Sequence, residues 1–378
     1  MNEKKKILIV SSAFYPEISP RSYRATELAK EFAHQGHNVT VISKYREYDY
    51  TSFLHKYAII FKMYPRPVFP SVPDYKRPFL KHLSRIARRM LSLTLEYPLI
   101  EEMFLVKRAL KNAAGFNIII SFAVPYPVHW GVAWARTRKH RIAEKWIADC
   151  GDPYMFCRLD TFRKPFYFSF LEKEFCKKCD FITVPFEEMR TQFYHQFHTK
   201  IKVIPQGFNF NDVTIFQGET KKNAPVFLFA GSVIPGKRDL SAFLDFLVGY
   251  EKDFEFIIYT NQQYLFEKYK RSLNGKIILK EYIERLQLIY EMSKVNFLVN
   301  VDTILDNNSN VEAIPSKLID YALSGKPILN LSSASLDKGL VLEFLEGNYT
   351  RQRTIDLERH NIKKVSAQFL SLCDSEVF

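Results

Sequence analysis

The sequence predicts an α/β fold with two doubly wound units built on parallel sheets. Its 378 residues exceed what one hydrophobic core normally organises, at roughly 100–200 residues per domain. In both halves, short apolar runs typical of buried parallel strands alternate with helical segments. Hydrophobic residues make up 47% of the chain and charged residues 25%, which excludes a disordered, collagen-like or coiled-coil protein.

The first half opens with a βαβ unit. Residues 6–11 form an apolar run, and apolar residues recur at three- and four-residue spacing through 22–34, as in an amphipathic helix. Gly36 ends that helix before a second strand at 39–42. Further strands are expected at 117–121, 146–149, 181–184 and 202–204. Ligands of such sheets bind beyond the carboxyl ends of the strands, so the site residues are expected there.

Several side chains near these strand ends are candidate ligand contacts. They are Phe14, Tyr15, Arg21, Ser121, His129, Asp149 and Asp152. A lone histidine such as His129 also suits a purely structural role. Asp149 and Asp152 follow a strand, and each could instead cap the segment after it.

The formal net charge of +13 is concentrated in the first half. Residues 1–200 carry 33 Lys and Arg against 19 Asp and Glu, whereas residues 201–378 carry 21 against 22. Residues 76–95 hold six cations and no acid, with Phe79, Leu83, Ile86 and Met90 at helical spacing. This pattern predicts an interfacial helix on an anionic membrane; a surface helix with a solvated basic face is the alternative. No nucleic-acid-binding module accompanies the charge, so nucleic acid is not an expected partner.

The second half repeats the alternation after a polar linker at 209–223. Strands are expected at 226–230, 254–259, 276–279, 296–300 and 327–329, and helices at 239–250, 283–292 and 316–323. We expect a first domain at 1–205, joined by a C-terminal helix at about 355–378, and a second domain at 206–354. The cleft between two such units is the natural substrate site.

Two loops of the second half suit a phosphate group. Residues 231–238 lie between a strand and a helix, where free N–H groups and the cations Lys237 and Arg238 are expected to converge. Residues 312–320 enter a helix with Pro315 and Ser316 at its start, and Asp320 could bind a sugar diol. By contrast, no Gly-x-Gly-x-x-Gly follows the first strand, which argues against a dinucleotide dehydrogenase.

Cysteine use and hydropathy indicate a cytoplasmic protein. The five cysteines are an odd number, as expected for reduced thiols. The Cys176-Lys177-Lys178-Cys179 segment has zinc-like spacing, yet the other cysteines do not form a second close pair, so half-buried thiols and no metal are expected. The apolar run 7–10 is too short for a signal peptide, and acids and a proline interrupt 90–106, the best candidate for a membrane span.

Taken in order, several segments resemble retaining nucleotide-sugar glycosyltransferases of the family-4 kind. These are Phe14-Tyr15-Pro16, Gly36-His37-Asn38-Val39-Thr40-Val41, 203–208, Gly231 with Lys237 and Arg238, and 312–329. The most specific segment is 315–327, and 146–153 resembles the subgroup that builds bacterial surface polysaccharides. The resemblance spans nearly the whole chain and implies the GT-B fold, two Rossmann-like domains facing a central cleft.

The resemblance also implies roles for individual residues. The family's Glu-x7-Glu motif falls on Glu312, beside the donor sugar and phosphates, and on Asp320, which would hold the ribose hydroxyls with a reach one methylene shorter. The arginine of the family's phosphate clamp falls at Ser232, so Lys237 or Arg238 must supply that cation. We favour Arg238 because its guanidinium can bind a diphosphate bidentately.

The expected site therefore has three parts. Catalysis is assigned to Glu312, Arg238, Lys237 and His129. Donor binding is assigned to Gly231, Ser232, Lys237, Arg238, Tyr282, Ile283, Glu312, Pro315, Ser316, Lys317 and Asp320. Acceptor binding is assigned to Phe14, Tyr15, Arg21, Ser121, His129, Asp149 and Asp152.

The implied reaction moves a sugar from a nucleotide-diphosphate sugar to a glycan or lipid-linked acceptor of lipopolysaccharide, O-antigen or capsule synthesis. Retention without metal or cofactor is expected, on the inner face of the cytoplasmic membrane. Two alternatives stay open. A nucleotide-sugar 2-epimerase could use the same architecture, and the departures at Ser232 and Asp320 fit a weakly catalytic binding partner.

Overall fold

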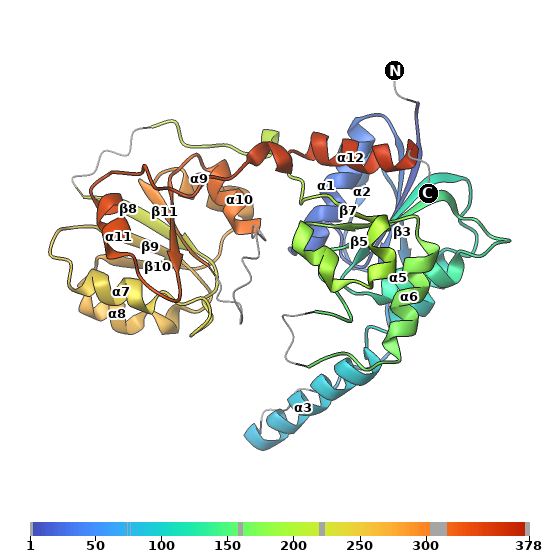
Figure 1. Ribbon diagram of the computed structural model, residues 1–378, viewed down its shortest axis with the longest axis horizontal. Coiled ribbons are helices and arrows are strands. Elements are labelled where there is room, and N and C mark those ends of the chain that lie inside the picture. Colours follow the sequence, from blue (N-terminus) through green and yellow to red (C-terminus); the bar gives the residue numbers. More distant parts are fainter. Residues whose placement is uncertain are drawn as a thin grey trace. The chain divides into compact units, whose positions relative to one another are not determined.

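A computed structural model describes residues 3–73, 75, 77–157, 162–218, 224–302 and 316–374. The chain divides into two compact units (Figure 1). Unit 1 comprises Met1–Phe208 and Arg359–Phe378, and unit 2 comprises Asn209–Glu358. Each unit is an α/β structure, as the sequence predicts.

Within the described residues, unit 1 is built on a parallel sheet of seven strands in the order β3-β2-β1-β4-β5-β6-β7. The strands are β1 (Lys6–Ser11), β2 (Asn38–Lys44), β3 (Ile60–Tyr64), β4 (Phe116–Ala123), β5 (Ala143–Cys150), β6 (Phe181–Val184) and β7 (Ile201–Val203). In β1, Ile7 and Ile9 enter one apolar core while Leu8 and Val10 enter another. Both faces of the sheet are therefore buried, which explains the unbroken apolar runs.

Unit 1 has seven helices in its described part, and all but the exposed α3 pack on the sheet or on neighbouring helices. They are α1 (Pro20–His34), α2 (Thr51–Tyr57), α3 (Pro78–Leu95), α4 (Glu101–Ala109), α5 (Pro127–Ala135), α6 (Phe168–Lys178) and α12 (Ile362–Asp374). Helix α1 begins with Pro20 after Ser19, whose side chain accepts a hydrogen bond from the Ser22 N–H. It ends before Gly36, which has φ +87°. Short 3-10 turns lie at Glu187–Gln192, His195–Lys200 and Leu357–His360.

The C-terminal helix α12 packs against α1 (Figure 1). Its Ile362, Val365 and Phe369 are buried in the core that holds Ile7 and Phe32. The helix expected at about 355–372 is thus a 3-10 turn followed by α12. The end of the chain completes the core of the first unit.

Unit 2 has, in its described part, a parallel sheet of five strands in the order β10-β9-β8-β11-β12. The strands are β8 (Val226–Ala230), β9 (Glu255–Tyr259), β10 (Ile277–Lys280), β11 (Phe297–Asp302) and β12 (Ile328–Ser332). Its helices are α7 (Ser241–Val248), α8 (Glu267–Ser272), α9 (Arg285–Met292), α10 (Ser316–Leu323) and α11 (Lys338–Leu345), with 3-10 turns at Phe210–Asp212 and Gln263–Leu265. Apolar residues of β8 again enter two cores, so this sheet is also covered on both faces.

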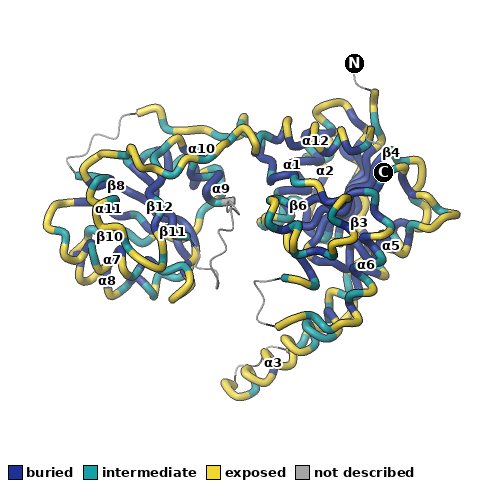
Figure 2. Tube along the Cα trace, viewed as in Figure 1, coloured by how far each residue is buried: buried dark blue, intermediate teal, exposed yellow. Residues whose placement is uncertain are grey.

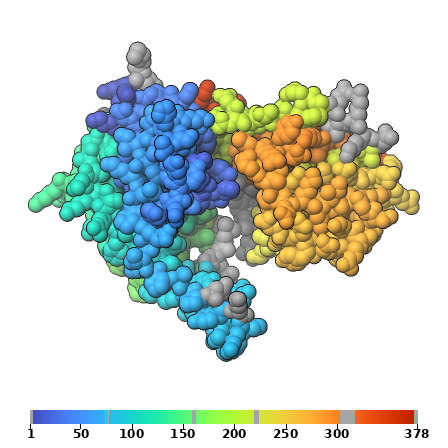
Figure 3. Space-filling view, turned by 180° about the vertical axis from the view of Figure 1, so that it is seen from behind, coloured from blue at the N-terminus to red at the C-terminus, as the bar shows by residue number. Residues whose placement is uncertain are grey.

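Helix α3 is 18 residues long, yet almost none of it is buried; the seven-residue α2 likewise has no buried residue. Figure 2 shows exposed residues along its length, and in Figure 3 it projects as a light-blue rod. Ser84 is its one buried residue. The apolar positions Phe79, Ile86 and Met90 are 73%, 48% and 53% exposed. This helix therefore has an apolar face that the described residues of its own unit leave exposed.

Candidate functional site

The candidate donor site lies at the carboxyl edge of the sheet in unit 2. The chain leaves the central strand β8 towards β9 on one side, while β11 lies on the other side. In doubly wound sheets, ligands bind where the connections diverge in this way. Gly231 follows β8 there with φ +140°, a conformation that only glycine adopts readily, and Asp302 ends β11.

The loop after β8 satisfies most of its own backbone. Internal acceptors take the N–H groups of Gly231, Val233, Ile234, Gly236, Lys237, Arg238 and Asp239. The Asp239 carboxylate lies at the start of α7, where it accepts from the Gly236 N–H at 3.1 Å and the Ser241 N–H at 2.9 Å. The expectation that these N–H groups are free for a phosphate is therefore wrong, because the turn itself, Asp239 and the nearby Tyr259, Gln262 and Ser333 accept their hydrogen bonds.

The cations of the donor side lie in different environments. Lys237 and Ser232 are exposed, whereas Arg238 is partly buried. Lys317, in the first turn of α10, has a buried Nζ with no hydrogen-bond partner among the described residues. Burial, followed by the nearby charge of Arg238, lowers the pKa of Lys317 to about 7. Positive charge therefore gathers between β8 and β11 through Arg238 and Lys317.

Asp320 is already engaged by a residue that the sequence did not single out. Its Oδ1 accepts hydrogen bonds from Nε of Arg285 at 2.9 Å and from Nη2 at 2.6 Å. Burial raises the pKa of Asp320, and the Arg285 charge opposes that rise. The free carboxylate expected for a ribose is thus an ion pair here. The one sequence signal for the Arg285–Asp320 ion pair is that Arg285 lies near the start of a predicted helix.

The remaining predicted donor residues divide into two groups. Tyr282 is 44% exposed, and burial raises its pKa while Arg238 lowers it, so these two side chains are neighbours. Ile283 packs against the core of unit 2. Glu312 and Pro315 lie outside the described residues, as does the side chain of Ser316.

The predicted acceptor set in unit 1 is largely buried. Phe14, Ser121, His129 and Asp149 have at most 1% of their surface exposed. Ser121 Oγ lies 2.8 Å from His129 Nδ1 and accepts a hydrogen bond from Trp146 Nε1 at 2.8 Å. Burial lowers the pKa of His129 to about 4, so its ring is neutral at pH 7. Direct acceptor contact by these side chains is corrected to a structural role, since they present no surface to a ligand.

Asp149 forms a buried ion pair with Arg24 rather than capping a segment. Arg24 donates to both carboxylate oxygens at 2.7 Å and to the carbonyls of Ile204 and Pro205. Thr183 Oγ1 donates to the same carboxylate at 2.6 Å. The pair therefore ties together α1, β5, β6 and the segment that follows β7.

Three residues of the predicted acceptor set reach the surface. Tyr15 stacks on Phe53 with ring centroids 4.6 Å apart, and Arg21 Nη2 donates to Asp152 Oδ2 at 2.6 Å. Arg21 passes so close to Gly151 that a Cβ there would lie 1.5 Å from Nη1. Gly151 therefore leaves room for the Arg21 guanidinium in its pair with Asp152, and a Cβ there would require that guanidinium to shift.

A polar centre next to this edge was missed by sequence reasoning. Glu102 of α4 is 1% exposed, and its carboxylate accepts from Ser12 Oγ at 3.0 Å, Tyr64 Oη at 3.0 Å and Lys44 Nζ at 3.2 Å. These partners follow or end β1, β2 and β3. Their separation along the chain gives no sequence signal for this cluster.

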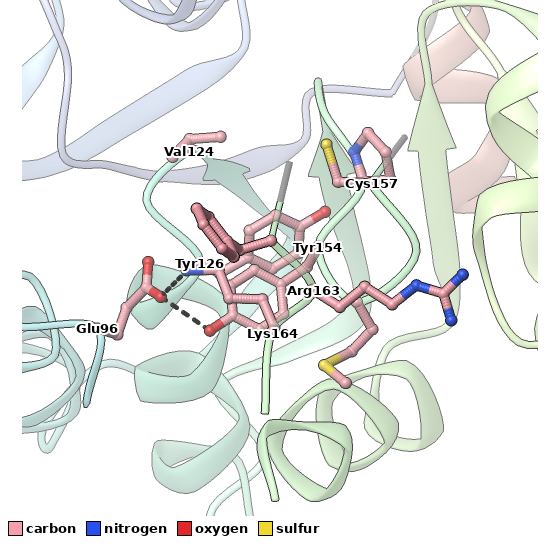
Figure 4. Close-up of a pocket in the computed structure, with 10 residues that line it drawn as sticks. Glu96, Val124, Tyr126, Tyr154, Cys157, Arg163 and Lys164 are labelled. Carbon is pink, nitrogen blue, oxygen red and sulfur yellow. Dashed lines mark hydrogen bonds and ion pairs between the residues drawn. The ribbon is translucent and has the colours of Figure 1, made fainter. Parts of the chain in front are cut away.

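A cavity of about 150 Å³ opens beside the carboxyl ends of β4 and β5 (Figure 4). Val124, Tyr126 and Tyr154 line it. Glu96 and Lys164 also line it, and Lys164 Nζ donates to Glu96 Oε2 at 2.5 Å. Tyr154 Oη donates to the same carboxylate at 2.9 Å. Since Glu96 directly follows α3, this cavity lies at the base of the exposed helix.

Three of the five cysteines are buried thiols, while Cys157 and Cys373 are partly buried. Cys150, Cys176 and Cys179 are buried, and burial raises the pKa of each thiol. No cluster of three metal-binding side chains occurs in the described ranges. Nor is any helix within those ranges long and apolar enough to cross a membrane.

No protein-family model and no curated protein sequence matches the chain. Its structure, however, is similar to solved glycosyltransferases. The lipopolysaccharide outer core galactosyltransferase WaaB, in its apo form, gives a TM-score of 0.59 at 12% identity, covering 97% of this chain and 98% of that one. A glycosyltransferase from Rickettsia africae gives 0.62 at 14% identity, covering 98% of both chains.

A third similar structure contains UDP-glucose. Anabaena Alr3699/HepE in complex with UDP-glucose gives a TM-score of 0.58 at 13% identity, covering 98% of this chain and 100% of that one. At these identities the likeness defines the fold. The chain has the GT-B fold, with two doubly wound α/β units.

Proposed function

We propose that this protein is a glycosyltransferase that takes its sugar from a nucleotide-diphosphate sugar. The carrying observation is that two basic side chains, Arg238 and Lys317, lie close together where the strand connections diverge in unit 2 of a GT-B chain. A diphosphate needs cations at such a point. UDP-glucose bound to a protein of the same fold supports this class of donor.

The geometry favours a reaction driven by electrostatic stabilisation. When the sugar leaves, negative charge grows on the diphosphate, and Arg238 and Lys317 stabilise that charge. The departing phosphate oxygen can accept the proton of the attacking hydroxyl. Transfer with retention and without metal follows from this proposal, with Glu312 beside the sugar as the family resemblance implies.

We further propose a lipid-linked or glycan acceptor of bacterial surface-polysaccharide synthesis, reached at a membrane. The apolar positions of α3 are exposed, and its cations include Lys81, Arg85 and Arg88. An amphipathic helix of this composition binds anionic lipid in the plane of the interface. The protein then acts as a peripheral protein on the cytoplasmic face, with the lipid-linked acceptor close to unit 1.

Arg238→Ala tests the donor site. Loss of one charge-stabilising donor normally lowers turnover about 10²- to 10³-fold. Donor choice is first settled by thermal shift with UDP-, GDP-, ADP- and CMP-sugars, since bound ligand raises the melting temperature. Sugar transfer is then measured with the donor that binds.

Arg271→Ala is the matched control, because this exposed arginine at the end of α8 has no described contact with the donor side. It should retain wild-type turnover. Equal turnover in both variants contradicts the assignment of Arg238. Formation of an epimer from donor without acceptor contradicts transferase activity and favours an epimerase.

A further inference from the structure

Among the described residues of unit 2, the amine of Lys317 is a buried group without a hydrogen-bond partner, as are Asn300 Oδ1 and Glu343 Oε2. Lys317 Nζ lies 4.5 Å from the ring centroid of Phe229 and 5.5 Å from that of Tyr321. A Cβ placed on Gly231 would be 3.7 Å from it. The group therefore faces the turn where the strand connections diverge.

Charged neighbours on each side define the electrostatics of this nitrogen. Arg238, from the loop after β8, disfavours the charged form of Lys317, and Asp302, at the end of β11, favours it more weakly. Asp302 is itself engaged by Arg353, with both N···O distances 3.1 Å. The Tyr321 ring also lies beside Lys317, and Tyr282 is a neighbour of Arg238. No described carboxylate forms a salt bridge with Lys317.

A buried charge without a counter-ion is unfavourable, and proteins commonly respond by holding the group neutral. Burial and Arg238 lower the pKa of Lys317 to about 7, so a large fraction of these side chains is unprotonated near neutral pH. A second anion placed between Lys317 and Arg238 would reverse this balance. Lys317 then gains a partner that no described residue provides.

We propose that Lys317 supplies the cation missing at Ser232, and that it takes up one proton from solvent when the donor's diphosphate binds. The neutral amine becomes an ammonium that donates hydrogen bonds to phosphate oxygens, and no other reactant is needed. This inference rests on the proposed function. It adds that donor affinity falls as the pH rises through neutrality, because protonation becomes less favourable.

Proton uptake distinguishes this role from simple packing. We suggest titration calorimetry of the full chain with UDP at pH 8, in HEPES and in Tris, whose ionisation enthalpies differ. The wild-type binding enthalpy should change between buffers by the amount expected for close to one proton. Uridine, which lacks the diphosphate, should show no such dependence.

Two variants of Lys317 separate the parts of the proposal. Lys317→Met should bind UDP about 10- to 100-fold more weakly, as expected for loss of a charged hydrogen bond, with its proton uptake gone and uridine affinity unchanged. Its melting temperature should equal or exceed that of the wild type, since an unpaired buried amine is removed. Lys317→Arg should bind UDP without proton uptake because arginine stays charged.

Lys326→Met is the control. This lysine is also partly buried, and burial lowers its pKa, but it precedes β12 at the opposite edge of the sheet. It should bind UDP with wild-type affinity and wild-type proton uptake. If Lys317→Met and Lys317→Arg keep the buffer dependence of the wild type, the inference is overturned while the proposed donor site stands. If the wild type binds neither UDP nor another nucleoside diphosphate, the proposed function fails and the inference with it.

Discussion

At the scale of single residues, the most exceptional side chain outside the candidate site is Glu172 of α6. It is fully buried, and neither carboxylate oxygen has a hydrogen-bond partner among the described residues. Burial raises its pKa to about 8, from 4.5 in the unfolded chain. The folded state therefore keeps a proton that the unfolded state releases above pH 4.5. Stability falls as the pH rises from about 4.5 to 8.

Glu172→Gln should remove this part of the pH dependence. The amide has nearly the volume of the protonated acid and cannot ionise, so the variant should be more stable than the wild type at pH 8 by a few kcal/mol. Near pH 5 the two proteins should differ little. Urea denaturation at both pH values measures the difference. His129 titrates near pH 4 in the folded state and is present in both proteins, so its contribution cancels.

Glu174→Gln provides the comparison on the same helix. Glu174 is 42% exposed and pairs with Lys178 at 2.9 Å, a surface ion pair whose loss should change stability by less than about 1 kcal/mol. A Glu172→Gln variant that loses stability between pH 5 and pH 8 as steeply as the wild type would refute the account of Glu172.

At the scale of elements, strands were predicted best. Strands such as β1 and β8 are buried on both faces, and a continuous apolar run in the sequence predicts such a strand. The edge strand β3 was missed because only Tyr64, the last of its residues, is buried. Helix α5 was left without bounds because eight of its nine residues are buried, which erases the helical period.

The edge of the sheet that carries each candidate site follows from the strand order, but the contacts there do not. Asp320 and Arg285 are 35 positions apart, and Trp146 meets Ser121 across 25 positions. Such pairs form only when the strands assemble, so a single sequence holds no sign of them. For the same reason, His129 looked like a ligand contact rather than a buried group.

Helix α3 carries a prediction at the same scale. Phe79→Ser combined with Ile86→Ser should leave stability nearly unchanged, because both side chains are 73% and 48% exposed in the free protein. Binding to vesicles with anionic lipid should weaken at least tenfold, since burying one large apolar side chain contributes about 1.5–3 kcal/mol. Flotation with such vesicles at low salt measures binding.

Tyr264→Ser is the control for α3, since Tyr264 is 72% exposed in unit 2 and belongs to no basic helix. It should float like the wild type. If the wild type itself does not float with anionic vesicles, α3 is a solvated surface helix and the membrane proposal is withdrawn.

At the scale of the whole molecule, the two ends of the chain share one core. Val365 and Phe369 of α12 are 0% exposed and lie among residues of β1 and α1. The guanidinium of Arg24 lies 5.5 Å from the Phe369 ring, while its other contacts hold Asp149 and the segment after β7. A substitution in α12 should therefore lower the local stability of β1 and α1.

Phe369→Ala should destabilise unit 1 by about 3–5 kcal/mol, the usual effect of removing a large buried ring. Hydrogen exchange followed by mass spectrometry can locate the effect. Peptides from β1 and α1 should exchange faster, because Ile7 and Phe32 lose a packing partner in the core they share. Gln368→Ala, one position away on the exposed side of α12, should exchange like the wild type. Unchanged protection of β1 in Phe369→Ala would show that α12 contributes little to this core, and that the first unit is complete without the end of the chain.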